Sequence, residues 1–188
     1  MTRLFSYVVD HDEGLAPHPT DRYCTLAWCK YKTKRRSNRN IVELAEKGDW
    51  VVGTGGTSCK SAGRGKLIYA MRVDHKVTLA EYCKNKRFAN RFDAVPDPSR
   101  KDRYALISRH FFYFGADAVS ILSRFRNYPL ETGRGFRYKN FTEDFISDFV
   151  GWLEREFKVG MNGKPCKPAP DFPTSRCPIT LKRKVCPR

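Results

Sequence analysis

The sequence has no apolar run that approaches the roughly 20 residues of a membrane-spanning helix, which argues against an integral membrane protein. After the short strand-like stretch 1–9, the polar residues 10–13 leave no room for the apolar core and cleavage site of a secretory signal. We therefore expect a cytoplasmic protein. Its seven cysteines are odd in number and include no pair two to four residues apart, so we expect reduced thiols and no structural zinc site.

Acidic residues are also scarce, because 20 Asp and Glu face 36 Lys and Arg, which gives a formal net charge of +16. Such an excess attracts polyanions, and the usual polyanion for a cytoplasmic protein is nucleic acid. Segment 30–39 contains six basic residues and no acid. With 40% hydrophobic residues the chain is too apolar to be disordered throughout. The composition therefore predicts a folded protein that binds nucleic acid or a nucleotide and does not enter a membrane.

The residue pattern predicts strands at 4–9, 23–29, 50–54 and 66–73, and one bent strand or two short ones at 104–114. Short helices are expected at 41–47 and at about 79–85, the second opened by a capping box of Thr78 and Glu81. From Thr142 the apolar spacing predicts a further helix that ends near Gly160. This order predicts an α+β domain with a mostly antiparallel curved sheet or a small β-barrel, flanking helices and a long C-terminal helix.

The composition changes after residue 163, because 164–188 contain six prolines, seven basic residues and one acid. We expect one domain over 1–163 and a basic, proline-rich tail over 164–188 on which the fold does not depend.

Glycines and basic residues are concentrated in segment 48–66. The segment is not a Walker A loop, because Cys59 and not glycine precedes Lys60-Ser61. It can connect strands 50–54 and 66–73 as a hairpin, and its backbone N–H groups beside Lys60 and Arg64 can hold a phosphate. These two interpretations are compatible.

A polar cluster of Asp10, Asp12 and Glu13 with His11 and His18 follows the first strand. A carboxylate and an imidazole can transfer protons together, so Asp10 with His11 or His18 could serve as acid and base. The same residues could bind a ligand without catalysis, or form a solvated loop. Cys24 is most simply a buried structural thiol.

Several segments, in this order, resemble the nucleotide modification associated domain 2 family. The resemblance covers about residues 4–160 and rests on segments 5–10, 24–27, 29–30, 48–55, 67–73, 81–82, 87–88, 106–108, 112–115 and 133–135, with Gly14 and Ala16-Pro17. It implies an association with DNA base modification in phage or bacteria. Residues 89–103 are shorter than the corresponding family segment, which puts in doubt any function that this insert supplies. Segments 48–52 and 65–73 are also similar to PUA-like domains, including the EVE group, which implies a curved β-barrel with a pocket for a base.

The candidate pocket combines loop 10–18 with segments 24–30, 48–56 and 113–115. Its expected ligand-binding residues are Pro17, Cys24, Lys30, Asp49, Trp50, Gly53, Gly55, Tyr113 and Gly115. The expected phosphate-binding residues are Lys34, Arg35, Arg36, Lys60, Arg64, Arg134 and Arg137. The predicted function is to bind a nucleic acid or nucleotide and read a base or modified base. The alternatives are an enzyme of base modification that uses Asp10, His11 and His18, or an interaction protein with a basic tail. The cofactor and the oligomeric state are left open.

Overall fold

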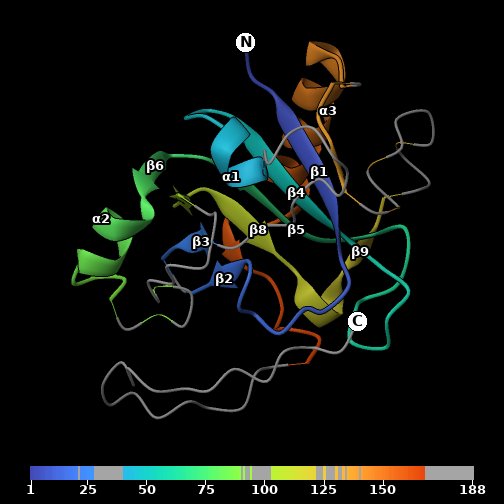
Figure 1. The fold of residues 1–188 in the computed structure, drawn as a ribbon. Helices are drawn as coiled ribbons and strands as arrows, with labels where there is room; N and C mark the ends of the chain where they lie inside the picture. The colour runs from blue at the N-terminus through green and yellow to red at the C-terminus, as the bar shows by residue number, and fades with distance from the viewer. Residues whose placement is uncertain are drawn as a thin grey trace.

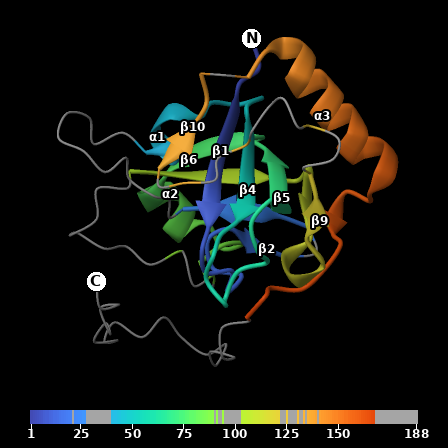
Figure 2. The ribbon, with the colours of Figure 1, turned by 90° about the vertical axis from the view of Figure 1, so that its right-hand side faces the viewer.

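Two β-sheets lie face to face, with one helix on the outer side of each (Figure 1, Figure 2). The computed structural model describes residues 1–20, 22–27, 40–89, 91, 94, 103–121, 125, 130, 133, 135–139 and 141–167. One apolar cluster fills the space between the sheets, a second lies under helix α3 (Glu143–Glu156), and a third lies under helix α2 (Leu79–Lys84). The expected α+β class is therefore confirmed.

The larger sheet has seven strands, and its centre is built from three of them. Strand β1 (Leu4–Val9) runs parallel to β4 (Trp50–Gly55), and β4 runs antiparallel to β5 (Lys66–Arg72). The glycine-rich segment thus connects a hairpin, as expected. The outer strands are β10 (Phe136–Arg137) beside β1, β8 (Phe111–Tyr113) and β9 (Val119–Ser120) beside β5, and β11 (Gly160–Met161) beside β8.

The second sheet is antiparallel throughout, in the order β2 (His18–Pro19), β3 (Cys24–Leu26), β7 (Tyr104–Ser108) and β6 (His75–Thr78). Segment 104–114 forms two strands that belong to different sheets, because β7 lies in the small sheet and β8 in the large one. Within the described residues each sheet has two free edges, so of the two expected forms, a curved sheet or a small β-barrel, the barrel is wrong.

The helices begin where the capping residues predict. Thr78 and Glu81 form the capping box of α2, and the side chain of Thr142 accepts a hydrogen bond from the N–H of Phe145 at the start of α3. Helix α3 ends at Glu156, earlier than Gly160, because Phe157 is already extended. Helix α1 (Ile41–Leu44) is shorter than expected, and a 3-10 turn follows β8 at Gly115–Asp117. In the part of the chain that is described, no helix combines the length and apolar character needed to cross a membrane.

The first residues of the expected tail pack against the domain. The carbonyl of Lys164 accepts a 2.7 Å hydrogen bond from the N–H of Ala116, and the N–H of Cys166 donates to Asp12 Oδ2 at 3.0 Å. The N–H of Lys167 donates to the carbonyl of Asp12, also at 3.0 Å. Residues 168–188 lie outside the described part, so the boundary at 163 stays a prediction.

These contacts predict a difference between two shortened chains. A chain that ends at 163 should be less stable than one that ends at 167 by about 1–2 kcal/mol, because Asp12 then loses buried hydrogen bonds. Its melting temperature should be lower by roughly 2–8 °C. Thermal denaturation of the two proteins measures this, and equal melting temperatures would show that residues 164–167 do not stabilise the fold.

Candidate functional site

Asp10 follows β1 at the point where β1 and β4 end side by side, since Val9 is in register with Gly55. Its side chain is half-buried. A methyl group on Gly56 would overlap Asp10 Oδ1 and would lie 2.9 Å from Val8 Cγ1, so only glycine leaves room for the carboxylate. The absence of a side chain at Gly56 therefore leaves space for the carboxylate of Asp10 at the end of β1, where the residue is partly exposed to solvent.

The loop between β4 and β5 folds back onto this end of β1. The hydroxyl of Ser61 donates a 2.6 Å hydrogen bond to the carbonyl of Val9 and accepts one of 2.8 Å from the N–H of Gly56. The N–H of Asp12 donates to the carbonyl of Lys60 at 3.1 Å. The loop is thus fixed against residues 9–12, beside Asp10.

The loop itself carries positive charge. Lys60 Nζ lies 3.5 Å from Glu13 Oε1, the side chain of Arg64 is exposed, and the exposed Lys66 begins β5. The structure therefore places the glycine-rich loop against the end of the first strand, and ligand binding by these residues stays a prediction.

Asp12 is buried and organises the inner side of the site. Its Oδ1 accepts a 2.5 Å hydrogen bond from the hydroxyl of Tyr113, and its Oδ2 accepts one from the N–H of Cys166. Burial first, and then the charge of Asp12, raise the pKa of Tyr113 and raise the pKa of Cys166 to about 11. The hydroxyl of Tyr113 and the thiol of Cys166 are therefore both protonated at neutral pH. The sequence placed Asp12 in the polar cluster but contained no signal of its burial.

A row of aromatic residues lies beneath this end of the large sheet. The register places Tyr7, Gly53, Tyr69 and Tyr113 side by side across four strands, and the hydroxyl of Tyr69 donates to that of Tyr7 at 2.8 Å. The ring of Tyr69 covers Gly53, so Gly53 accommodates a ring of the protein itself. The buried Cys24 belongs to the same cluster, as expected for a structural thiol.

The structure does not bring His18 to Asp10. His18 lies in β2 opposite Thr25, and residues that face each other across antiparallel strands point to the same side of the sheet. Thr25 faces Tyr82 of α2 and Arg91, on the outer face of the small sheet. The expected pairing of Asp10 with His18 is therefore wrong, whereas the exposed His11 remains next to Asp10.

The position of His18 has a consequence for stability. Burial first, and then the charge of Arg91, lower the pKa of His18 from 6.5 to about 4. Between pH 6.5 and 4 the unfolded chain binds a proton that the folded chain does not, so the stability contributed by neutral His18 is lost as the pH falls. The slope is at most about 1.4 kcal/mol per pH unit. Urea denaturation at several pH values measures the free energy of unfolding. This free energy should fall less steeply with decreasing pH in the His18→Gln variant than in the parent. An equal slope in the two proteins would contradict the low pKa of His18.

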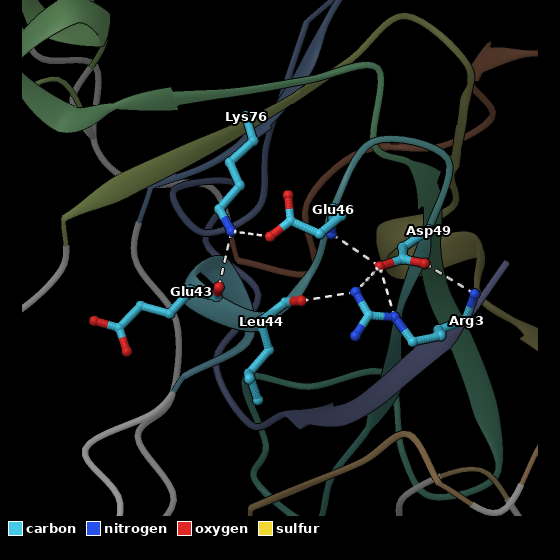
Figure 3. A network of polar contacts seen from close by, with 6 residues as sticks. All are labelled: Arg3, Glu43, Leu44, Glu46, Asp49 and Lys76. Carbon is cyan, nitrogen blue, oxygen red and sulfur yellow. Dashed lines mark hydrogen bonds and ion pairs between the residues drawn. The ribbon is translucent and has the colours of Figure 1, made fainter. Parts of the chain in front are cut away.

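Asp49 and Trp50 lie at the opposite end of β4, about 16 Å from Gly55 by the rise of a strand. Figure 3 shows the carboxylate of Asp49 enclosed by protein donors: Oδ1 accepts from the N–H of Arg3 at 2.9 Å, and Oδ2 accepts from the Arg3 guanidinium at 2.6 and 3.1 Å. The N–H of Glu46 donates to Oδ2 at 2.8 Å. Asp49 therefore links β1 to the turn before β4 and is not part of the site near Asp10.

Trp50 instead borders a groove of about 430 Å³ at the side of α3. The groove is lined by Thr2, Trp50, Glu143, Ile146, Ser147, Val150, Gly151 and Glu154. Its charged lining residues are acidic, which does not favour a phosphate ligand. We therefore place the candidate site at Asp10.

The remaining expected residues have different positions. Pro17 is buried, and Gly115, with φ +56°, packs closely on the backbone of Lys164. Arg137 lies in β10, in register with Ser6. Lys30, Lys34, Arg35, Arg36 and Arg134 lie outside the described residues. In the described part, no three His, Cys, Asp or Glu side chains are placed to hold a metal ion.

Fold and site together define a mixed α+β domain of two sheets, with a carboxylate held over the end of one sheet beside a basic, glycine-rich loop. The model of the family named nucleotide modification associated domain 2 matches residues 1–104 and 94–171, so the chain belongs to this family. Comparisons with curated proteins and with solved structures found no match.

Proposed function

We propose that the protein binds a nucleotide or nucleic acid at Asp10 and reads a base there, as part of DNA base modification. The observation that carries the proposal is the half-buried carboxylate seated on Gly56, with the cationic loop of Lys60 and Arg64 fixed beside it. Membership of a nucleotide modification associated family supports the same ligand class.

The carboxylate of Asp10 suits the base of a nucleotide, and the basic loop suits its phosphate. A carboxylate accepts hydrogen bonds and donates none, so it pairs with the exocyclic amine or ring N–H of a base. Lysine and arginine form charge-assisted hydrogen bonds with phosphate oxygens. Because His18 lies on the other sheet, we favour binding over acid–base catalysis by Asp10 and His18. A PUA-like relationship, suggested by the β4–β5 hairpin, stays a prediction.

Asp10→Asn tests this proposal. We expect the variant to keep its melting temperature within a few degrees and to lose at least about tenfold in affinity, which corresponds to about 1.4 kcal/mol, because an amide presents an N–H where the base requires an acceptor. Calorimetric titration with the four deoxynucleoside 5′-monophosphates measures the affinity. Asp148→Asn, at an exposed position of α3, is the matched control and should bind like the parent.

An Asp10→Asn protein that binds every nucleotide like the parent would contradict the proposal. Asp10 would then only shape the turn after β1, a role that asparagine can also fill.

A further inference from the structure

A second cationic surface lies beside α2. Figures 1 and 2 show α2 on the side of the molecule away from α3. It consists of Arg87, Arg91 and Arg109 around the rings of Tyr23 and Phe88, and we call it the Tyr23 arginine patch. The guanidinium of Arg109 lies 6.0 Å from the centre of the Tyr23 ring, and Arg87 Nη1 lies 3.4 Å from the Tyr23 hydroxyl. The two rings pack edge to face at 5.4 Å.

Arg91 is fixed at the inner side of this patch. Its Nη1 donates to Thr25 Oγ1 at 2.7 Å and to the carbonyl of His18 at 3.2 Å, and its Nη2 donates to Thr20 Oγ1 at 2.7 Å. Its guanidinium also lies over the Phe88 ring at 5.2 Å. A guanidinium has five N–H groups, so two of them have no acceptor in the described part of the chain. Arg91 is therefore held in one orientation, and two of its N–H groups have no acceptor among the described residues.

The side chains of the three arginines also lack acidic partners among the described residues. Their side chains contact hydroxyls, a carbonyl and aromatic rings, whereas the side chains of Arg3, Arg72 and Arg103 each pair with a carboxylate. The backbone N–H of Arg109 donates to Asp74 Oδ2 at 2.6 Å, but Asp74 also pairs with Arg72. Glu81 of α2 is engaged in the capping box with Thr78. Within the described ranges, no carboxylate forms an ion pair with these three side chains, and the field of Arg91 contributes to the low pKa of His18.

We propose that the Tyr23 arginine patch binds the phosphodiester backbone of a nucleic acid, so that the ligand is a polymer and not a free nucleotide. Arginine suits this role because its planar donors match phosphate oxygens and its side chain stacks on aromatic rings. The patch lies on the outer face of the small sheet, whereas Asp10 lies at the end of the large sheet. A nucleic-acid strand that contacts both the patch and Asp10 must contain several nucleotides. This inference extends the proposed function but does not depend on base reading by Asp10.

The test is the double variant Arg87→Gln/Arg109→Gln in the full chain. Among the described residues, neither side chain makes a hydrogen bond that joins two elements, apart from the 3.4 Å contact of Arg87 with Tyr23, so we expect the fold to be kept. Arg91 is left unchanged because it bonds β2 and β3. Arg155→Gln/Lys158→Gln, at two exposed positions of the α3 side, removes the same charge and is the control. Fluorescence anisotropy with labelled single-stranded DNA, single-stranded RNA and duplex DNA of about 20 nucleotides distinguishes the kinds of backbone.

We expect the patch variant to bind at least one of these oligonucleotides about tenfold more weakly than the control variant at 50 mM salt. Its slope of log affinity against log salt should be smaller by roughly 1 to 2, since each phosphate contact contributes about 0.7–0.9. Binding of mononucleotides should be unchanged. The proposal is overturned if both variants bind every oligonucleotide alike, or if the parent binds mononucleotides but no oligonucleotide. An oligonucleotide defect in the patch variant together with an unaffected Asp10→Asn protein would support the patch and contradict base reading by Asp10.

Discussion

Gly53→Ala is expected to destabilise the protein by about 3 kcal/mol. A methyl group at this position would lie 2.5 Å from Tyr69 Cδ1 and 2.7 Å from Val9 Cγ2, closer than real Cβ contacts. Tyr69 cannot easily move away, because its ring is fully buried and its hydroxyl donates to Tyr7. Overpacking of a buried site that cannot relax costs typically 1–3 kcal/mol and sometimes more. Urea denaturation measures the change in the free energy of unfolding.

Gly151→Ala is the matched control, because Gly151 lies within α3 and its added methyl would meet only the flexible end of Arg155, at 3.2 Å. Alanine in a helix interior is favoured over glycine by up to about 1 kcal/mol, so this variant should be slightly more stable. A Gly53→Ala protein as stable as the parent would show that the ring of Tyr69 does not occupy the space over Gly53.

Asp12→Ala is expected to destabilise the protein by a similar amount, about 3 kcal/mol. The substitution leaves the buried hydroxyl of Tyr113 and the N–H of Cys166 without their acceptor. Each unsatisfied donor costs roughly 1–3 kcal/mol. The chain from Lys164 to Lys167 is then attached less firmly, so proteases should cleave it faster in the variant. Chemical denaturation and limited proteolysis measure these two effects.

A double-mutant cycle with Tyr113→Phe separates the hydrogen bond from the other effects of the substitution. The costs of Asp12→Ala and Tyr113→Phe should not add, because either change alone breaks the same bond, and we expect a coupling of at least about 1 kcal/mol. Additive costs would contradict the assigned pairing of Tyr113 with Asp12.

Much of the fold could be predicted from local patterns. The strands at 4–9, 50–55 and 66–72 and the caps of α2 and α3 depend on residues close in the sequence. The parallel pairing of β1 with β4 joins residues about 46 apart and follows from no local signal. The two-residue strands β2, β9, β10 and β11 are too short to show alternation. Whether the sheets close into a barrel depends on the same long-range contacts, so it could not be predicted from local patterns either.

The site was predictable in part, for the same reason. A carboxylate after a buried strand and a basic glycine-rich loop are visible in the sequence, and the structure brings Asp10 and Lys60 to the same strand end. Asp49 was expected there because glycines follow it, but a six-residue strand separates it from Gly56 and its partner is Arg3. Arg91 was not identified from the sequence, because its neighbours Thr20 and Thr25 are about 70 residues away.

The most direct test of the account is to map a bound nucleotide on the protein by NMR. Backbone amide signals would be followed while deoxynucleoside 5′-monophosphates, and then a single-stranded oligonucleotide, are titrated into the ¹⁵N-labelled chain. We expect the largest changes at Asp10, Gly56 and Ser61, where the carboxylate and the basic loop meet. Changes concentrated at Trp50, Ser147 and Gly151 would place the ligand in the groove beside α3 and would contradict a site at Asp10.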